Sequence, residues 1–131
     1  MDIKFKKKDK NLLLQDLCPR LLYGIRCSFG VDDAIYEITG INPSSCGASE
    51  IQATHIKSGI NGDFTISSCK PYLFPLSSMT EEQKKEEYKL MNSNFYTSTV
   101  ELSDFYNRNH IDYRGLIPKG LAKDATGLNI Y

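Results

Sequence analysis

The chain has 131 residues, 40% of them hydrophobic, and its 16 basic and 16 acidic side chains leave no formal net charge. This length and composition predict one domain over residues 1–131 with a single core. The balance of charge removes the broad positive field that non-specific nucleic-acid binding usually needs, so a DNA-coating role is disfavoured.

Lysines crowd residues 1–10, at Lys4, Lys6, Lys7, Lys8 and Lys10. Such a run predicts a soluble, flexible leader, with an edge strand guarded by lysines or a contact with phosphates or a membrane surface as the alternatives. No apolar run reaches the length of about 18 residues that a membrane span needs, and the apolar stretch after the lysines is too short for a signal peptide. The protein is therefore expected in the cytoplasm and not on a membrane.

The first part of the chain predicts a helix and a β-hairpin. Leucines at three- and four-residue steps favour a short helix over about residues 9–18, which Pro19 ends. Alternating apolar residues then predict two paired strands, residues 21–28 and 34–39. The Gly, Pro, Ser and Asn residues of the stretch 40–49 predict a loop.

A second hairpin is predicted by the Asn61-Gly62 step, which lies between alternating runs at residues 51–56 and 64–69. The next stretch, residues 70–76, contains two prolines. Because proline cannot donate a backbone hydrogen bond, we expect an extended crossover there and not a central strand.

Two further helices are predicted after this crossover. Thr80 and Gln83 have the spacing of a capping box, which predicts a helix from Glu81 to about Met91. Ser98 repeats the signal before an apolar stripe and predicts a second helix, shorter and better buried. This order predicts an α+β fold, a small antiparallel sheet of about four strands with helices packed on one side.

Residues 113–131 predict an ordered, extended C-terminal arm. The segment carries aliphatic side chains, three glycines and a proline, whereas disordered tails are poor in such anchors. Its aliphatic residues favour docking onto the sheet or exchange with a second subunit of a homo-oligomer. Its polar residues make it the densest candidate site in the chain.

No metal or cofactor is predicted. Cys27, Cys46, His55 and Cys69 are spread singly, whereas zinc sites commonly draw their ligands from close pairs such as CxxC. The cysteines are better explained as small buried residues. Residues 120–127 carry glycine, lysine and hydroxyl groups but lack the order of a P-loop.

Four stretches carry a resemblance to other proteins: Asp16–Gly24, Lys70–Gln83, Asp112–Ile117 and Asp124–Tyr131. In these stretches the chain resembles uncharacterised small proteins of gut Bacteroidales and their phages and prophages. The resemblance implies a mobile-element accessory protein that works in a bacterial cytoplasm. It implies no activity or catalytic residue, and it is weakest over residues 31–68.

The first functional hypothesis is a binding protein without catalytic activity, because no catalytic signature is present and tyrosines provide an adaptable contact surface. Such a protein would act against host defence, either by blocking a host protein or by sequestering a nucleotide messenger. Aromatic rings would stack on the base and basic groups would meet the phosphates. The candidate ligand-binding residues are Tyr23, Arg26, Tyr113, Arg114, Lys119 and Lys123.

Two other functions stay open. A nucleic-acid accessory protein would use the lysine leader on phosphates and Tyr72 or Phe74 for stacking. A small hydrolase would use His110 with Asp112 as the carboxylate that orients the imidazole. The sequence contains no nucleophile motif that would favour the hydrolase.

Overall fold

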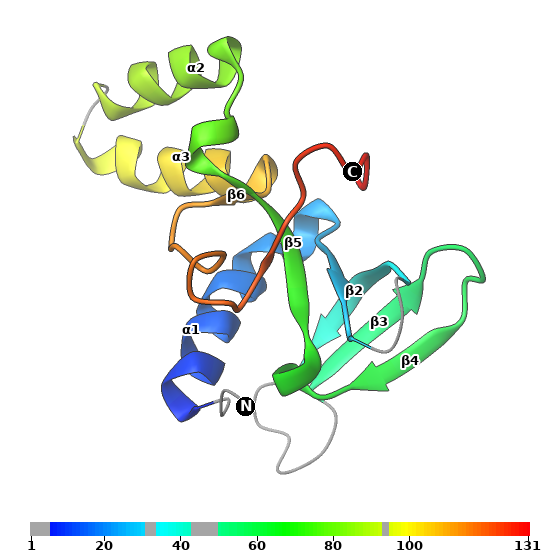
Figure 1. The fold of residues 1–131 in the computed structure, drawn as a ribbon. Coiled ribbons are helices and arrows are strands. Elements are labelled where there is room, and N and C mark those ends of the chain that lie inside the picture. The colour runs from blue at the N-terminus through cyan, green and yellow to red at the C-terminus, as the bar shows by residue number, and fades with distance from the viewer. Residues whose placement is uncertain (1–5, 31–33, 43–49, 93–94) are drawn as a thin grey trace.

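The computed structural model describes residues 6–30, 34–42, 50–92 and 95–131 (Figure 1). The helices are α1 (Lys7–Leu17), α2 (Glu81–Met91) and α3 (Phe95–Arg108), and short 3-10 helices lie at Cys18–Tyr23, Ile66–Ser68 and Leu76–Ser78. The strands are β1 (Arg26–Ser28), β2 (Tyr36–Ile41), β3 (Ile51–His55), β4 (Asn61–Phe64), β5 (Lys70–Pro75), β6 (Ile111–Asp112) and β7 (Lys123–Asp124). The fold is α+β, as predicted.

The described strands form one mixed sheet in the order β4-β3-β2-β1-β5-β6, and β7 also pairs with β5. The pairs from β4 across to β5 are antiparallel, whereas β6 and β7 run parallel to β5. The prediction of an antiparallel sheet of about four strands is therefore wrong in detail. It omitted β5 and the two short strands that the C-terminal part of the chain adds.

The helical path does not end at Pro19, in contrast to the prediction. α1 ends at Leu17, and Pro19 then lies in the first turn of the 3-10 helix, where its missing N–H removes no helical hydrogen bond. The residues predicted to open the first strand are helical for this reason, and β1 is reduced to three residues.

The last four residues of the predicted leader are helical. α1 begins at Lys7, and Lys10 forms an ion pair of 3.0 Å with Glu50, which is 7% exposed just before β3. Residues 1–5 lie outside the described residues. The prediction of a flexible leader over residues 1–10 is therefore wrong for residues 7–10.

Both predicted hairpins form, but the second is shifted. β2 continues into the predicted loop, of which residues 43–49 lie outside the described residues. β3 and β4 pair from Thr54 opposite Asn61, so the Asn61-Gly62 step opens a strand and does not form the turn. The turn precedes it, where Gly59 has a φ of 73° that favours glycine. The predicted strand 64–69 is mostly the 3-10 helix that follows β4.

β5 lies inside the sheet, so the prediction of a crossover at residues 70–76 is wrong. Successive strand residues direct their backbone groups to opposite edges. Leu73 directs its carbonyl toward β7, where it accepts a hydrogen bond of 2.8 Å from the Ala125 amide. Pro71 and Pro75 share this edge with Leu73, and β7 is only two residues long. The hydrogen bond from this part of the chain goes to Leu73, which lies between the two prolines. The absence of an N–H group at Pro71 and Pro75 therefore does not interrupt the sheet.

The predicted start of α2 is confirmed. Thr80 Oγ1 accepts from the Gln83 amide at 3.1 Å, and Gln83 Oε1 accepts from the Thr80 amide at 2.9 Å. α3 begins before the predicted cap at Ser98 and is longer than α2, but it is the better buried helix, as predicted. Phe105 of α3 is fully buried, whereas α2 has no buried residue. The two helices lie beyond the end of β5 in Figure 1, while α1 runs beside this strand.

The main core lies between α1 and the sheet and includes the start of the C-terminal segment. Its buried residues are Leu13, Leu17, Ile25, Cys27, Phe29, Ile38, Ile51, Ala53, Ile66, Cys69, Leu73, Leu116 and Ala122. Cys27 and Cys69 are buried as predicted, Cys18 is exposed, and Cys46 lies outside the described residues. Residues 113–131 are thus packed on the domain, and part of the predicted arm is strand β7.

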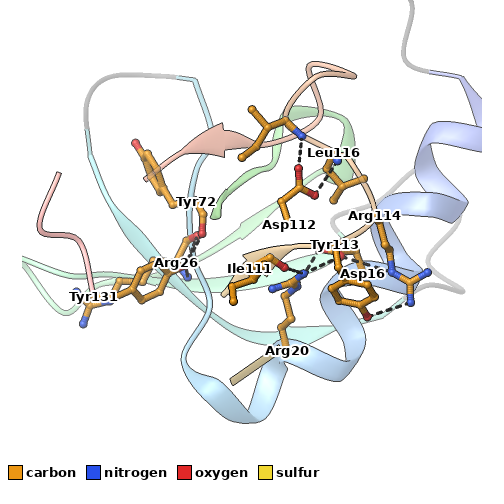
Figure 2. Close-up of polar contacts among 11 residues, drawn as sticks. Asp16, Arg20, Arg26, Tyr72, Ile111, Asp112, Tyr113, Arg114, Leu116 and Tyr131 are labelled. Carbon is orange, nitrogen blue, oxygen red and sulfur yellow. Dashed lines mark hydrogen bonds and ion pairs between the residues drawn. The ribbon is translucent and has the colours of Figure 1, made fainter. Parts of the chain in front are cut away.

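Tyr131 bridges the sheet where β1 and β5 separate. The pairing of Cys27 with Pro71 puts Arg26 opposite Tyr72 in the same register. The Tyr131 hydroxyl lies between these two residues, because it accepts from the Arg26 amide at 2.9 Å and donates to the Tyr72 carbonyl at 2.7 Å (Figure 2). A side chain therefore replaces a hydrogen bond of the backbone ladder.

The substitution Tyr131→Phe tests this bridge. Removing the hydroxyl should lower the free energy of unfolding in urea by about 1–2 kcal/mol, because two backbone groups lose their shared partner. The matched control is Tyr88→Phe on α2, where the side chain is 72% exposed, and it should change stability by less than about 0.5 kcal/mol. Equal effects of the two substitutions would contradict the bridging role.

Candidate functional site

A cleft of about 640 Å³ lies between the end of β5 and the first part of the C-terminal segment. Pro75 and Leu76 line it from one side, and Ile117 and Pro118 line it from the other. Asp112, Tyr113, Arg114 and Asp124 supply its charged and aromatic groups. The cleft therefore combines apolar walls with a small number of polar groups, as ligand sites commonly do.

Asp112 holds one wall of this cleft in place. Its Oδ1 accepts a hydrogen bond of 2.8 Å from the Leu116 amide, and its Oδ2 accepts one of 2.9 Å from the Ile117 amide (Figure 2). The side chain is 5% exposed. Both carboxylate oxygens are thus used to close the loop, and Asp112 acts as a structural cap.

Beside the cleft, a buried carboxylate joins two arginines. Asp16 and Arg20 have fully buried side chains and form two hydrogen bonds of 3.0 Å, and Arg20 Nη2 also donates to the Ile111 carbonyl at 2.6 Å. Arg114 Nε lies 3.5 Å from Asp16 Oδ1. Burial raises the pKa of Asp16, while Arg20 and Arg114 act in the opposite direction. The Arg114 guanidinium is therefore already paired with an acid of the protein.

Tyr113 is held by rings and cations of the protein itself. Its ring is stacked on that of Tyr106 with the centroids 5.0 Å apart, and the guanidinium carbons of Arg20 and Arg114 lie 5.4 and 5.1 Å from its centroid. The Tyr113 hydroxyl accepts a hydrogen bond of 3.3 Å from Arg114 Nη2. These contacts leave little of the ring for stacking on a ligand.

The other four predicted site residues do not line the cleft. Arg26 donates to the Ile130 carbonyl, and its Nε lies 3.7 Å from Glu37. Lys123 Nζ lies over the Tyr72 ring, 5.9 Å from its centroid, and 3.5 Å from Ser28 Oγ. Tyr23 ends the 3-10 helix half-buried, and Lys119 is exposed.

Of the predicted site residues, the structure brings only Tyr113 and Arg114 together in the cleft. The sequence analysis did not identify Asp16 and Arg20, which hold these two side chains in place. The spacing of Asp16 and Arg20, four residues apart, is a signal that could have suggested their ion pair. Pro19 obscured it by predicting a helix end between them. Nothing in the sequence connects this pair to the carbonyl of Ile111, because 91 residues separate Arg20 from it.

His110 is not oriented by Asp112, whose carboxylate is bonded to the backbone amides. The His110 ring is stacked on Tyr131 with the centroids 3.7 Å apart, and within the described residues its Nδ1 has no hydrogen-bond partner. Burial, with Arg20 and Arg26 nearby, lowers the pKa of His110 to about 4. This arrangement gives no support to the hydrolase hypothesis.

Tyr72, proposed above for stacking on nucleic acid, is 7% exposed and packs with Ala125 and Ile130 in a small second core. Phe74 is half-buried against the same cluster. Neither ring is placed like an open stacking platform.

Within the described part of the chain, no group of three or more His, Cys, Asp or Glu side chains is arranged to hold a metal ion. The helices of this part are also too short or too polar for any of them to cross a membrane.

Asp16→Leu tests the buried ion pair. Because it leaves Arg20 buried without its acid, the free energy of unfolding should fall by about 3–5 kcal/mol, as measured by urea denaturation. The control is Glu86→Leu, which removes a pair with Arg108 in which both side chains are 50% exposed, and it should cost less than about 1 kcal/mol. Replacing both Asp16 and Arg20 by leucine should restore part of the lost stability. If Asp16→Leu and Glu86→Leu lowered the free energy of unfolding by similar amounts, the role of burial would be contradicted.

His110 gives the stability a pH dependence of known sign. In the unfolded chain the imidazole gains a proton as the pH falls below about 6.5, whereas in the folded protein it stays neutral down to about pH 4. The unfolded state therefore binds more protons in this interval, and the free energy of unfolding should fall as the pH drops through it. His110→Asn should flatten this part of the curve, because asparagine does not titrate and accepts the φ of 56° at this position.

The pH curve is measured by urea denaturation at several pH values, with His55→Asn as the control. Because the control retains His110, its free energy of unfolding should still fall as the pH drops from about 6.5 to about 4. A curve for His110→Asn that is parallel to that of the unsubstituted protein would contradict the prediction.

No family model matches the sequence, and comparisons with curated proteins and with solved structures also found no match.

Proposed function

We propose that the chain is a non-enzymatic binding protein and that the cleft beside Tyr113 takes a mostly apolar ligand without net negative charge. Its volume of about 640 Å³ lies in the range typical of ligand sites. Pro75, Leu76, Ile117 and Pro118 provide apolar contact on two sides. The loop that carries two of these residues is fixed by Asp112, so the cleft is formed before a ligand arrives.

The charges around the cleft are the observation that favours an apolar ligand. Arg114 is the basic residue of the lining, and its guanidinium is shared between Asp16 and the Tyr113 hydroxyl. Asp124 brings a carboxylate to the same cleft, and hydrogen bonds from Thr126 lower its pKa, which keeps it ionised near neutral pH. Among the described residues that line the cleft, the cation that a phosphate would meet is Arg114, which is already paired with Asp16, and the Asp124 carboxylate would repel it. A nucleotide messenger is therefore a poorer ligand for this cleft than an apolar group.

The resemblance to phage and prophage proteins supplies a setting for this proposal. In a bacterial cytoplasm the ligand would be a host component, either an apolar small molecule or an apolar segment of a host protein such as a defence factor. Both sources offer the same chemistry to the cleft. The experiment must therefore distinguish them.

Leu76→Asp tests the proposal, because Leu76 lines the cleft and is 44% exposed, so a charge there should spare the fold. The tagged protein is incubated with lysate of a gut Bacteroidales bacterium, recovered, and analysed by native mass spectrometry. A small ligand adds its mass to the intact chain, whereas a host protein is recovered as a second polypeptide. Leu76→Asp should reduce the retained ligand about tenfold or more, because it places a charge in an apolar contact.

The control is Leu22→Asp, since Leu22 is 90% exposed outside the cleft, and it should retain the ligand fully. Recovery of nothing by the unsubstituted protein, or equal retention by both variants, would overturn the proposal. Recovery of a nucleotide that Leu76→Asp also retains would favour a different site.

A further inference from the structure

A second cavity, of about 270 Å³, lies at the β3–β4 hairpin. In Figure 1 this hairpin projects from the end of the sheet opposite α2 and α3. Tyr36 and His55 are directly opposed on β2 and β3, and Gly62 and Phe64 follow on the same face of β4. All four residues line the cavity. It is therefore a feature of the sheet itself and is separate from the cleft beside Tyr113.

Aromatic rings form the walls of this cavity. The Tyr36 ring meets the rings of His55 and Phe64 edge to face, with centroid distances of 5.2 and 5.0 Å. The buried Phe29 stacks on Phe64 at 3.9 Å and supports it from the core. Ile60, which is 69% exposed, adds an apolar group at the rim. These rings are held in place by the protein and provide edge and face contacts for another ring.

His55 offers this cavity a hydrogen-bond donor with a defined position. Its Nδ1 accepts a hydrogen bond of 3.1 Å from the Ser58 amide and lies 2.8 Å from Ser58 Oγ. Ser58 Oγ is itself held by the Ile60 amide at 3.2 Å. Because Nδ1 is an acceptor, the proton of the neutral ring is on Nε2. His55 can thus donate from Nε2 to an acceptor on a bound molecule.

Gly62 sets the shape of the cavity through a close approach to Phe64. A Cβ at this position would lie 3.0 Å from two ring atoms of Phe64, closer than ordinary contact allows. The phenyl ring therefore lies directly against the backbone of Gly62. A Cβ at this position would force the ring to shift by a few tenths of an ångström.

We propose that this cavity binds a planar heteroaromatic ring that carries a hydrogen-bond acceptor, of the size of one pyrimidine base. Tyr36 and Phe64 contact the ring, and its acceptor accepts a hydrogen bond from His55 Nε2–H. The volume of about 270 Å³ is sufficient for one such ring. The site does not depend on the function proposed for the cleft.

The test uses uracil and 5,6-dihydrouracil, which share both carbonyl acceptors but differ in ring aromaticity. Each is titrated into the full-length protein and followed by two-dimensional NMR. Uracil should bind with a dissociation constant of about 1 mM, as expected for a small fragment, and should shift the signals of Tyr36, His55 and Phe64. Dihydrouracil should bind at least about fivefold more weakly, because it lacks the ring contacts.

Variants separate the two kinds of contact. His55→Phe keeps a ring but removes the donor, and should weaken uracil binding about fivefold. Gly62→Ala should weaken it through the displaced Phe64. The matched control is Gly40→Ala on β2, whose Cβ would lie too close only to Gln52 Oε1, at 2.5 Å, and this atom is the far end of a flexible side chain, so binding should stay unchanged.

The proposal is overturned if uracil causes no shifts at the hairpin, if the shifts appear only at the cleft beside Tyr113, or if dihydrouracil binds as well as uracil. Equal affinity of His55→Phe and the unsubstituted protein would overturn the assigned donor. Circular dichroism of each variant shows whether the fold is retained, and a second donor deletion, His55→Leu, replaces His55→Phe if that variant does not fold.

Discussion

The carboxylate of Asp16 is fully buried and is paired with Arg20, four residues further along the chain, and both side chains also contact the C-terminal part of the protein. Arg20 donates to the Ile111 carbonyl and so attaches the N-terminal helical segment to β6. Arg114 approaches the same carboxylate from the C-terminal segment. A buried ion pair contributes little net stability compared with apolar residues of the same volume, but loss of one partner is costly because it leaves a buried charge unpaired. The position of β6 and of the cleft therefore depends on this pair being intact.

The C-terminal segment is both a wall of the cleft and a structural part of the sheet. Leu116 and Ala122 enter the main core, β7 pairs with β5, and the Tyr131 hydroxyl connects β1 to β5. Residues that looked available for a ligand in the sequence are mostly used by the protein itself. Arg114 is paired with Asp16, and Arg26 binds the Ile130 carbonyl. What remains for a ligand is mainly apolar surface, which is why the proposed ligand carries no negative charge.

The two cavities differ in how much the sequence could reveal. Tyr113 and Arg114 were singled out because they are polar residues in an anchored segment, and the structure does place them in a cleft. The aromatic cavity was not predicted, because Tyr36, His55 and Phe64 lie on three different strands. The Asn61-Gly62 step also predicts the turn, which lies a few residues earlier in the structure, so the predicted strand begins at Phe64, where β4 ends.

Features that depend on neighbouring residues could be predicted from the sequence. Thr80 and Gln83 start α2 because their side chains and amides are within reach in one helical turn. The alternation of apolar residues identified β2 and β3, and the composition of residues 113–131 indicated an ordered segment. Only the tertiary structure decided that β5 is a central strand, since the edge that each proline faces depends on which strands pair with it. It also decided the partners of Arg20 and Tyr131, which are 91 and 105 residues away, because local spacing carries no information about contacts over such separations.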